Sequence, residues 1–442
     1  MSEVNTLALI LLDLSHQLQD NITFVVWLLP VVLMYELPLM ILVVTGILRF
    51  YYLEHVLIPK RSLYRPDISC IITCYAEGEA VKETIRSLAE QTYEGHIEII
   101  AVVDGAVQNQ ATYIAALASK QFCNASNRSL IVLPKWQRGG RVSTLNAGLD
   151  RAQGELVINA DADTSFDNDM VCRVVPYFED PNVPALGGAL RVRNTHQSIW
   201  TRMQSIEYLI SMQGGKTGLA QWNLLNNISG AFGVFRRSFL VHIGGWDTHT
   251  AEDLDLTIRI KQYFSRHPNW RIPFATLAIG HTDAPSDLKT LFWQRMRWDG
   301  DLLFLYFRKH WPAFTPRLLG VGTFIFTLVY GFLQNVLMPF IIVIYSATLA
   351  FSFPWQFILS ITIIIYLLYL CFLIFSYGIV LTAISERPKA DLALAKWLPL
   401  YPLYAIFMRL ICLFALLNEI FRRSHEESSM APWWVMKRGK KF

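Results

Sequence analysis

The sequence contains little charge for its length, and this scarcity excludes two classes of protein. Charged residues make up 17% of the 442 residues and hydrophobic residues make up 53%, whereas a soluble globular domain has about 25% charged residues. A disordered chain and a fully soluble enzyme are therefore excluded. The charge is concentrated between Arg49 and Pro316 and near the C-terminus. Apolar segments thus flank a middle region that is long enough to bury a core.

Strong basic clusters and cysteine-based metal motifs are also missing. The net charge is only +4, from 39 basic and 35 acidic residues, which is weak for a nucleic-acid-binding protein. The six cysteines form no CxxC motif and no Cys/His cluster, so a zinc site is not expected. We predict no nucleic-acid partner and place the excess positive charge on the cytoplasmic side of a membrane.

The N-terminal apolar segment, Phe24–Leu48, contains one charged residue, Glu36. It exceeds the roughly 20 residues that a helix needs to cross a bilayer. It lacks the basic start and small-residue cleavage site of a signal peptide. Acidic residues precede it and basic residues follow it, which places the middle of the chain in the cytoplasm. The shorter run Leu7–Leu12 is predicted to lie at the membrane interface.

Further apolar segments follow the middle region, at Leu318–Phe353, Gln356–Ala383 and Trp397–Phe421. Leu318–Phe353, which contains Pro339, is longer than a single span requires. It could form one tilted helix, or an interfacial piece followed by a span. Three crossings from a cytoplasmic domain would leave the basic C-terminal tail outside, against the positive-inside rule. Either Leu318–Phe353 forms a hairpin or the last segment is re-entrant, and four to five spans are predicted.

The middle of the chain alternates between strand and helix patterns. Strands are predicted at Asp67–Cys74, His96–Val103, Ser129–Leu133 and Glu155–Asn159, and helices at Glu79–Gln91 and Gly140–Ala152. This alternation is typical of an α/β domain with a parallel sheet. Such sheets bind ligands at the carboxyl ends of their strands. Tyr75, Asp104 and Asp161 follow predicted strand ends, which indicates a nucleotide site.

Asp161 and Asp163 follow the fourth predicted strand. Residues two apart on an extended chain face the same side, and paired carboxylates there suit a hard divalent cation that holds a diphosphate. The alternative is a polar turn in which Asp163 bonds to its own backbone. The position after a strand of an α/β unit favours the cation site.

Glu252 and Asp253 begin a helix predicted over Glu252–Tyr263, with Thr250 as its expected cap. Acidic residues in a first turn stabilise a helix through its dipole by about 0.3–1 kcal/mol. A carboxylate in a closed sugar site can also serve as the general base that deprotonates an acceptor hydroxyl. Both readings stay open from this motif alone.

Two further motifs precede the C-terminal apolar block. Gln294, Arg297 and Trp298 share one face of an amphipathic helix predicted over Asp287–Phe307. They suit a phosphate and a sugar ring, or simply a membrane interface. The small-residue run from Asn227 to Gly233 contains Ser229 and Gly230. It allows close approach of the backbone to a ligand, or forms a tight turn.

Taken together, these motifs resemble those of membrane-embedded family 2 glycosyltransferases, the group of cellulose, hyaluronan and poly-N-acetylglucosamine synthases. The resemblance spans roughly residues 65–310. It rests on the ordered set CYAEGE, VVDG, DAD, SGAFGVFRR, AED and QRMRW, which starts at residues 74, 102, 161, 229, 251 and 294. It implies a nucleotide-sugar-binding domain of GT-A type with a mostly parallel sheet, flanked by transmembrane and interfacial helices.

The resemblance also implies roles for individual residues. Asp253 would be the general base, and Arg297 would stabilise the leaving diphosphate. Asp161 and Asp163 would hold Mg²⁺ or Mn²⁺. The nucleotide sugar would be bound by Thr73, Tyr75, Glu77, Asp104, Arg141, Asp161 and Asp163. The acceptor would be bound by Ser229, Gly230, Glu252, Gln294 and Trp298. The sequence departs from the family pattern at Ala251, usually Thr, and at Arg141, usually Lys.

The predicted organisation follows from these assignments. Residues 1–50 form an N-terminal membrane segment and residues 51–285 a cytoplasmic catalytic domain. Residues 286–317 form the interfacial helix, residues 318–421 the transmembrane segments and residues 422–442 a basic cytoplasmic tail. An integral protein of a bacterial inner membrane is expected.

The leading hypothesis is an inverting, processive transferase that polymerises a UDP-activated sugar, by resemblance an N-acetylhexosamine, into a β-linked cell-surface polysaccharide. Four to five spans are few for one chain to form a channel for the polymer by itself, so a small membrane partner subunit or a homo-oligomer is expected. The alternatives are a transferase that adds a single sugar to a membrane lipid, and an inactive relative that serves as a scaffold or receptor in an envelope complex.

Overall fold

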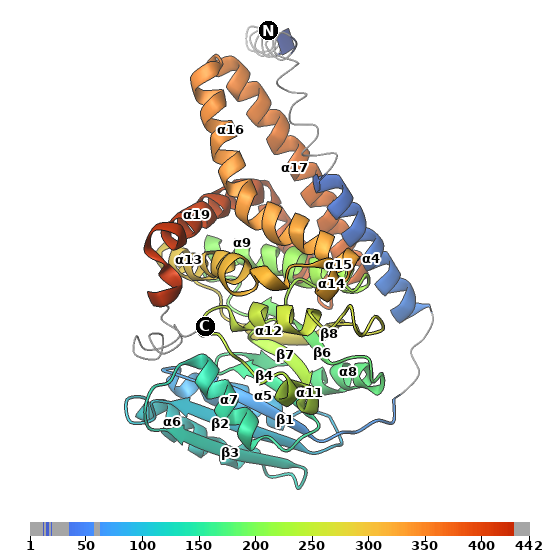
Figure 1. Cartoon of the computed structure of the whole chain (residues 1–442), viewed down its shortest axis with the longest axis vertical. Helices are drawn as coiled ribbons and strands as arrows, with labels where there is room; N and C mark the ends of the chain where they lie inside the picture. The colour runs from blue at the N-terminus through green and yellow to red at the C-terminus, as the bar shows by residue number, and fades with distance from the viewer. Residues whose placement is uncertain (1–11, 13–14, 17–18, 20–34, 57–61, 428–442) are drawn as a thin grey trace.

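The computed structural model describes residues 12, 15–16, 19, 35–56 and 62–427. Most of the segment Leu7–Leu12, and residues 24–34 of the first predicted span, lie outside these residues. A sheet with helices on both faces forms one end of the molecule, and long apolar helices rise from the other end (Figure 1).

The sheet has the strand order β3-β2-β1-β4-β7-β6-β8-β5. Its first half is parallel and consists of β1 (Ile68–Cys74), β2 (Ile97–Asp104), β3 (Arg128–Lys135) and β4 (Leu156–Asp161). These are the four predicted strands. They form because each is a continuous apolar run that can be buried on both faces. In the register, Ile68 lies opposite both Ile97 and Leu156.

The second half of the sheet was not anticipated in detail. It comprises β5 (Ser165–Phe166), β6 (Ala185–Val192), β7 (Phe232–Arg236) and β8 (Phe274–Thr282). β7 lies between β4 and β6 and is antiparallel to both, whereas β6 and β8 run parallel. β7 follows the small-residue run directly, so this pairing places that run beside the end of β4.

Two hydrophobic clusters hold the helices on opposite faces of the sheet. Cys70 and Ile72 pack with α5 (Val81–Ala89), α6 (Gln110–Ala118) and α8 (Met170–Val174). Ile71, between them in sequence, packs with α7 (Arg141–Arg151) and α12 (Glu252–Lys261). Successive side chains of a strand point to opposite faces, so one strand supplies both clusters. The short α11 (Arg237–His242) follows β7.

Among the residues that the structure describes, four helices are long and apolar enough to cross a membrane. The first is α4 (Leu37–His55), which extends beyond the predicted end at Leu48. The others cover residues 321–352, 355–383 and 388–422. They comprise α15 (Val321–Phe326), the π-helical turn η8 (Thr327–Leu337), α16 (Met338–Ser352), α17 (Trp355–Ala383), α18 (Pro388–Leu394), η9 (Ala395–Leu400) and α19 (Tyr401–Arg422).

The predicted alternative of a hairpin within Leu318–Phe353 is wrong, because residues 321–352 form one helix. Pro339 lies where the π-helical segment η8 ends and α16 begins, and such local changes of helical geometry accompany prolines inside helices. α16 and α17 rise together and are joined at the end far from the sheet (Figure 1).

The last apolar helix, α19, packs along α13 (Leu288–Phe304), the interfacial helix predicted over Asp287–Phe307. A Cβ atom on Gly300 of α13 would lie 3.5 Å from the Ala415 carbonyl oxygen and 3.4 Å from Ser424 Oγ. The described end of the chain, η10 (Ser424–Glu427), therefore lies against α13. This packing favours the re-entrant alternative for the last segment.

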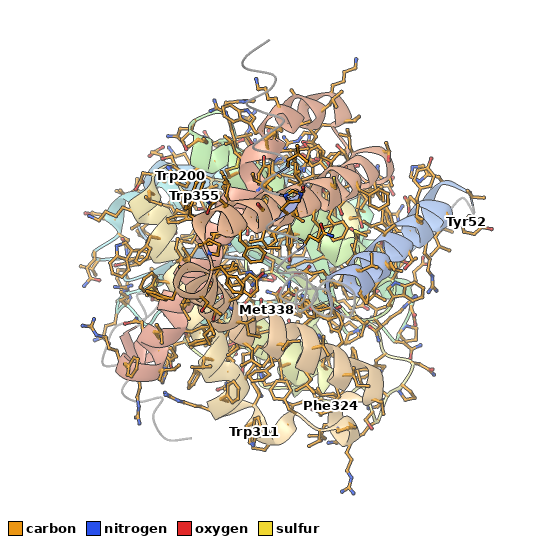
Figure 2. All side chains as sticks on the ribbon, turned by 90° about the horizontal axis from the view of Figure 1, so that it is seen from above. Tyr52, Trp200, Trp311, Phe324, Met338 and Trp355 are labelled. Atoms are coloured by element: carbon orange, nitrogen blue, oxygen red, sulfur yellow. The ribbon has the colours of Figure 1, made fainter. Side chains whose placement is uncertain are left out.

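Exposed aromatic side chains project from the periphery of the helical end. Tyr52, near the end of α4, and Trp311, after α13, point outward when the molecule is seen from above (Figure 2) and are 51% and 63% exposed. Such residues favour the level of the lipid headgroups. Their positions suit a membrane boundary near the sheet domain.

A buried ion cluster joins the sheet to the apolar helices. Arg191 of β6 is 1% exposed and donates to Glu386 Oε1 at 2.9 Å and to Asp391. Both carboxylates belong to the segment between α17 and α19. Ser385 Oγ also donates to Asp391 Oδ2, at 2.6 Å. Arg387 lies farther from the same carboxylates, at 3.6 Å from Glu386 Oε1 and 4.0 Å from Asp391 Oδ1. Because the buried Arg191 guanidinium contacts both carboxylates, the cluster fixes β6 relative to α17.

We predict that Arg191→Met lowers the melting temperature by roughly 10 °C. The substitution leaves Asp391, whose side chain is 3% exposed, with only the more distant Arg387 as a cation partner, and removing one partner of a buried ion pair costs about 3–5 kcal/mol. The control is Arg193→Met, because Arg193 pairs with Asp283 at 2.9 Å while both side chains are more than a third exposed, and such pairs contribute about 0–1 kcal/mol. Equal thermal shifts for the two purified variants would contradict the prediction.

Candidate active site

Asp104 fixes the turn that starts α7. Its two carboxylate oxygens accept hydrogen bonds from the backbone N–H groups of Gly139 and Gly140, each at 2.8 Å. Lys135 Nζ donates to it at 2.8 Å, and the residue is 3% exposed. In this structure Asp104 holds the backbone that places Arg141 at the first position of α7. Its contact with a nucleoside stays a prediction.

Arg141 joins the two sides of the site. Its guanidinium pairs with Asp161 at the end of β4 and with Glu252 at the start of α12. It also donates to the Gly230 carbonyl at 2.6 Å and to Thr73 Oγ1 at 3.2 Å. A planar guanidinium can reach several oxygens in fixed directions, which a lysine ammonium cannot do in the same way. The predicted donor and acceptor residues are thus brought together by one side chain.

Glu77, Asp161 and Asp163 form an acidic group beside Arg141. Burial and repulsion from Asp163 and Asp161 raise the pKa of Glu77 to about 7. Burial and repulsion from Asp161 likewise raise the pKa of Asp163 to about 6. The turn that carries Glu77 is tight, since Ala76 and Gly78 both have positive φ. The site therefore contains more negative charge than its own cations neutralise.

This donor set fits Mg²⁺ or Mn²⁺. Carboxylate oxygens are the ligands that these cations prefer, and Mg²⁺ is commonly held by one or two carboxylates together with substrate phosphates. Within the described ranges, no three His, Cys, Asp or Glu side chains form a complete metal-binding group. The protein would therefore supply part of the coordination sphere, through Asp161 and Asp163, and the nucleotide would supply the rest.

Asp253 lies across the site on the first turn of α12. Its Oδ2 atom accepts hydrogen bonds from Asn227 Nδ2 at 3.1 Å and from the Gly230 N–H at 3.2 Å. Thr250 is not the helix cap, contrary to prediction: the capping position is Ala251, and no side chain caps the helix there. Ala251 has φ 41°, a conformation that costs a non-glycine residue about 1–3 kcal/mol. This strained residue sets the direction in which Glu252 and Asp253 leave the loop.

Gly230 is closely packed. A Cβ atom there would lie 3.1 Å from Glu252 Oε1 and 3.4 Å from an Arg141 guanidinium nitrogen. Asn159 of β4 holds the same loop, since it donates to the Gly230 carbonyl and accepts from the Gly233 N–H at 2.9 Å. Asn159 was missed from the sequence because an amide inside an apolar strand has no motif. Ser229 caps this turn, accepting from the Ala231 N–H at 3.4 Å.

The QRMRW segment lies in α13, and the residue that follows this helix, Leu305, packs against Leu254 and Ile258 of α12. Arg295, which was not predicted, forms a bidentate ion pair with Glu207 at 2.8 and 2.6 Å. Its guanidinium also lies 4.9 Å from the Trp298 ring centre. The Gln294 Oε1 atom is buried without a hydrogen-bond partner among the described residues. The roles of Gln294, Arg297 and Trp298 toward diphosphate and acceptor stay predictions.

Two neighbouring residues complete the description. Tyr75 is 42% exposed, and the Arg138 guanidinium lies 4.1 Å from its ring centre, so the ring stands at the open side of the site. Asp255 points away from the site and accepts from His310 Nε2 at 2.7 Å and Lys309 Nζ at 2.8 Å. Burial raises its pKa, but His310, Arg259 and Lys309 outweigh burial and lower it to about 2.

Comparisons with known proteins show what the chain is similar to in sequence and in fold. Poly-beta-1,6-N-acetyl-D-glucosamine synthase of Staphylococcus aureus (strain COL) is 29% identical over 276 residues, which cover 60% of this chain and 63% of that protein. The enzyme of the same name from Staphylococcus epidermidis is 28% identical over 261 residues, covering 59% and 60%. The matched region thus spans less than two thirds of these relatives.

Among solved structures, the mannosyltransferase PcManGT from Pyrobaculum calidifontis, in complex with GDP-Man and Mn²⁺, superposes with a TM-score of 0.50. It is 18% identical, with 87% of this chain and 99% of that chain covered. At this identity the likeness concerns the fold, which is GT-A-like. Residues 69–243 match the model of Glycosyl transferase family 2. This part of the chain, which runs from β1 to the end of α11, is therefore similar to family 2 glycosyltransferases.

Proposed function

We propose that the protein is an inverting, processive glycosyltransferase that polymerises a UDP-activated N-acetylhexosamine into a β-linked cell-surface polysaccharide. The observation that carries the proposal is the junction at Arg141 and Gly230. It places an acidic group suited to a metal-bound diphosphate beside Asp253, whose carboxylate is oriented by Asn227. The named relatives supply the sugar class.

In the proposed reaction, Asp253 takes the proton of an acceptor hydroxyl. The hydroxyl oxygen then forms a bond to the anomeric carbon of the donor sugar. The bond between that carbon and the diphosphate oxygen breaks, and its electron pair leaves with UDP. Arg141 and Arg297 would attract the developing negative charge. One displacement inverts the anomeric centre, so an α-linked donor yields a β-linkage.

A bound Mg²⁺ or Mn²⁺ would neutralise diphosphate charge and make UDP a better leaving group. Asp161 and Asp163 are the residues proposed to hold it. Glu77 lies close enough to raise the negative potential there. In the unliganded protein, Arg141 provides the positive charge nearest Asp161.

The proposal includes passage of the product into the membrane. Support comes from a cavity of about 500 Å³ that is lined by α4, η5 (Tyr208–Gly215), α10 (Lys216–Ala220), η8, α17 and α19. Asn227 lines this cavity and donates to Asp253, so the cavity begins beside the proposed base. We further propose a bacterial inner membrane, a cytoplasmic sheet domain, and a small membrane subunit or second copy that completes the path.

The first test incubates membrane-reconstituted protein with a panel of labelled UDP-sugars and Mn²⁺, and measures released UDP and product size. We expect one sugar, an N-acetylhexosamine, to give a long product. A single small lipid-soluble product would instead identify a lipid transferase. Turnover of no sugar above the level of an Asp253→Asn variant would favour an inactive scaffold.

The role of Asp253 is tested by its amide variant. We expect Asp253→Asn to lower kcat by about 10²–10⁴-fold, because the amide cannot accept the hydroxyl proton. Asp247→Asn is the matched control, since Asp247 pairs with Lys309 at 2.7 Å outside the site and is 40% exposed. Retention of kcat in a folded Asp253→Asn variant would exclude Asp253 as the base.

The metal site is tested by UDP binding, independently of turnover. Isothermal titration with and without Mn²⁺ is expected to show that chelation by EDTA weakens UDP binding at least about tenfold. We expect Asp163→Asn to weaken the Mn²⁺-dependent binding by a similar factor, about 1.4 kcal/mol. Asp169→Asn, which alters an exposed pair with Arg173, should not. A UDP Kd that changes neither on removal of Mn²⁺ nor in the Asp163→Asn variant would contradict this assignment.

A further inference from the structure

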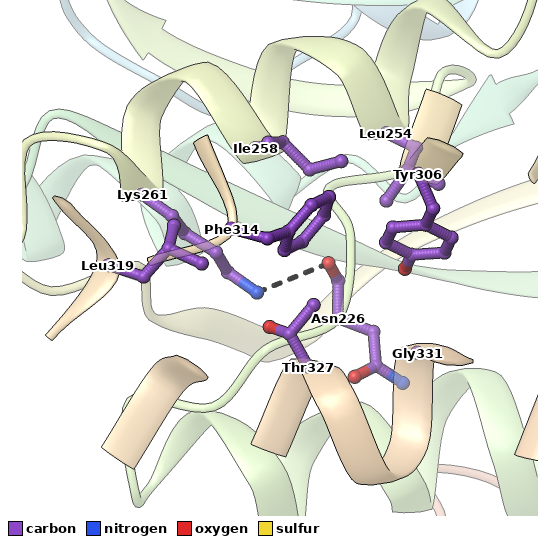
Figure 3. Close-up of a pocket in the computed structure, with 9 residues that line it drawn as sticks. All are labelled: Asn226, Leu254, Ile258, Lys261, Tyr306, Phe314, Leu319, Thr327 and Gly331. Carbon is purple, nitrogen blue, oxygen red and sulfur yellow. Dashed lines mark hydrogen bonds between the residues drawn. The ribbon is translucent and has the colours of Figure 1, made fainter. Parts of the chain in front are cut away.

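Lys216 and Lys261 are both buried, and their surroundings differ. Lys261 of α12 is 5% exposed and donates to the Asn226 carbonyl oxygen at 3.4 Å. It borders a pocket of about 20 Å³, which is closed by apolar side chains such as Phe314 and Leu319 (Figure 3). This space suffices for a single water molecule. The Lys261 ammonium is thus a structural group.

Lys216 of α10 has a different environment. It is 8% exposed, and no hydrogen bond or ion pair joins its ammonium to another side chain in the part of the chain that the structure describes. It lines the cavity of about 500 Å³ that begins beside Asp253. A buried ammonium without a partner is costly unless something in its cavity accepts its hydrogen bonds.

The charge of Lys216 is oriented toward the proposed chemistry. Burial lowers its pKa to about 8, while attraction to Asp253 opposes this change, so the amine is mainly protonated at neutral pH. Asn227 lines the same cavity and holds Asp253 Oδ2 at 3.1 Å. A ligand that contacts Lys216 would therefore extend toward the base.

The lining of the cavity combines apolar and polar side chains. Glu36, Gln334 and Tyr369 contribute polar groups from three different helical segments, and the Tyr369 hydroxyl donates to Glu36 Oε1 at 3.3 Å. Most of the other lining residues, such as Val43 and Leu373, are apolar. A saccharide suits this combination, because its hydroxyl groups bind polar side chains while its C–H faces pack on apolar ones, whereas a lipid tail would leave the polar groups unpaired. A volume of about 500 Å³ lies in the range of small-ligand sites.

We propose that Lys216 binds the acceptor saccharide in this cavity and thereby keeps the growing chain in register with Asp253. The ammonium donates to hydroxyl or N-acetyl oxygens of the sugar that lies behind the reacting residue. Lys216 is a positioning and acceptor-binding residue rather than a catalytic one. This inference rests on the proposed polysaccharide synthesis, because it assigns the acceptor of that reaction.

The test compares Lys216→Met with Lys216→Arg and with Lys261→Met, all as full chains in lipid nanodiscs. A β-1,6-linked N-acetylglucosamine pentasaccharide is the acceptor probe, and its Kd is measured by titration together with that of UDP and Mn²⁺. We expect Lys216→Met to raise the pentasaccharide Kd about tenfold or more, as for a lost hydrogen bond to a charged group. The UDP Kd should stay within about twofold.

Lys216→Arg should restore most of the pentasaccharide affinity, and Lys261→Met should leave it unchanged. In turnover assays, Lys216→Met should give shorter products while donor hydrolysis to water continues at the original rate. An unchanged pentasaccharide Kd in Lys216→Met with an unaltered melting temperature would overturn the proposal. Equal losses in Lys216→Met and Lys261→Met would also overturn it, since the effect would then be structural.

The outcomes also separate this inference from the proposed function. If no UDP-sugar gives a polymer but the pentasaccharide binds through Lys216, the proposed synthesis fails and the acceptor site stands. If undecaprenyl phosphate binds in place of the saccharide, and Lys216→Met abolishes that binding, the saccharide assignment is overturned in favour of a lipid acceptor.

Discussion

The buried guanidinium of Arg141 is the constraint on which the site depends. It brings Asp161 from β4 and Glu252 from α12 to one point, and it contacts the Gly230 carbonyl between them. Without this cation, two carboxylates would lie close together with little water to separate their charges, and each would be costly to bury. The donor side and the acceptor side of the proposed reaction therefore cannot be arranged independently. A donor diphosphate that approaches Asp161 enters the field of a cation that also holds the start of the helix carrying Asp253.

The apolar helices are fixed to this site by two further ion pairs. Arg191 ties β6 to the segment after α17, and Arg295 ties α13 to Glu207, which in turn accepts from the Tyr404 hydroxyl of α19 at 2.8 Å. These contacts are buried or nearly so, and a buried pair resists separation because each charge would be left without a partner. The cavity that begins at Asn227 is bounded by helices held in this way. The position of the cavity relative to Asp253 therefore depends on the ion pairs of Arg191 and Arg295 as well as on the membrane helices.

The sequence was sufficient for the first half of the sheet because each strand is a continuous apolar run, and the polar residues that matter follow where the run stops. The same reasoning could not find β7 between β4 and β6, since strand order depends on which surfaces pack, not on local pattern. It singled out Asp161, Arg141, Glu252, Gly230 and Asp253, which lie together in the structure, but it did not foresee that the Asp104 carboxylate also holds the turn before α7. Asn159, Arg295 and Lys216 carry no motif. Asn159 and Arg295 matter because their hydrogen-bond partners lie far away in sequence. Lys216 matters because its ammonium has no hydrogen-bond or ion-pair partner among the described residues.

The two departures from the family pattern have a common physical account. Arg141 replaces the usual lysine, and Ala251 replaces the usual threonine. In space they meet at Glu252, which follows Ala251 and pairs with Arg141. A non-glycine residue persists in the left-handed region only where surrounding contacts hold it there. Here the ion pair fixes Glu252, while Asn227 and the Gly230 N–H fix Asp253, so the strained turn is held from both following residues. A lysine would present a point charge without the fork that reaches Asp161, Glu252 and Gly230 together. Arg141 thus helps to hold the start of α12, where no side chain caps the helix.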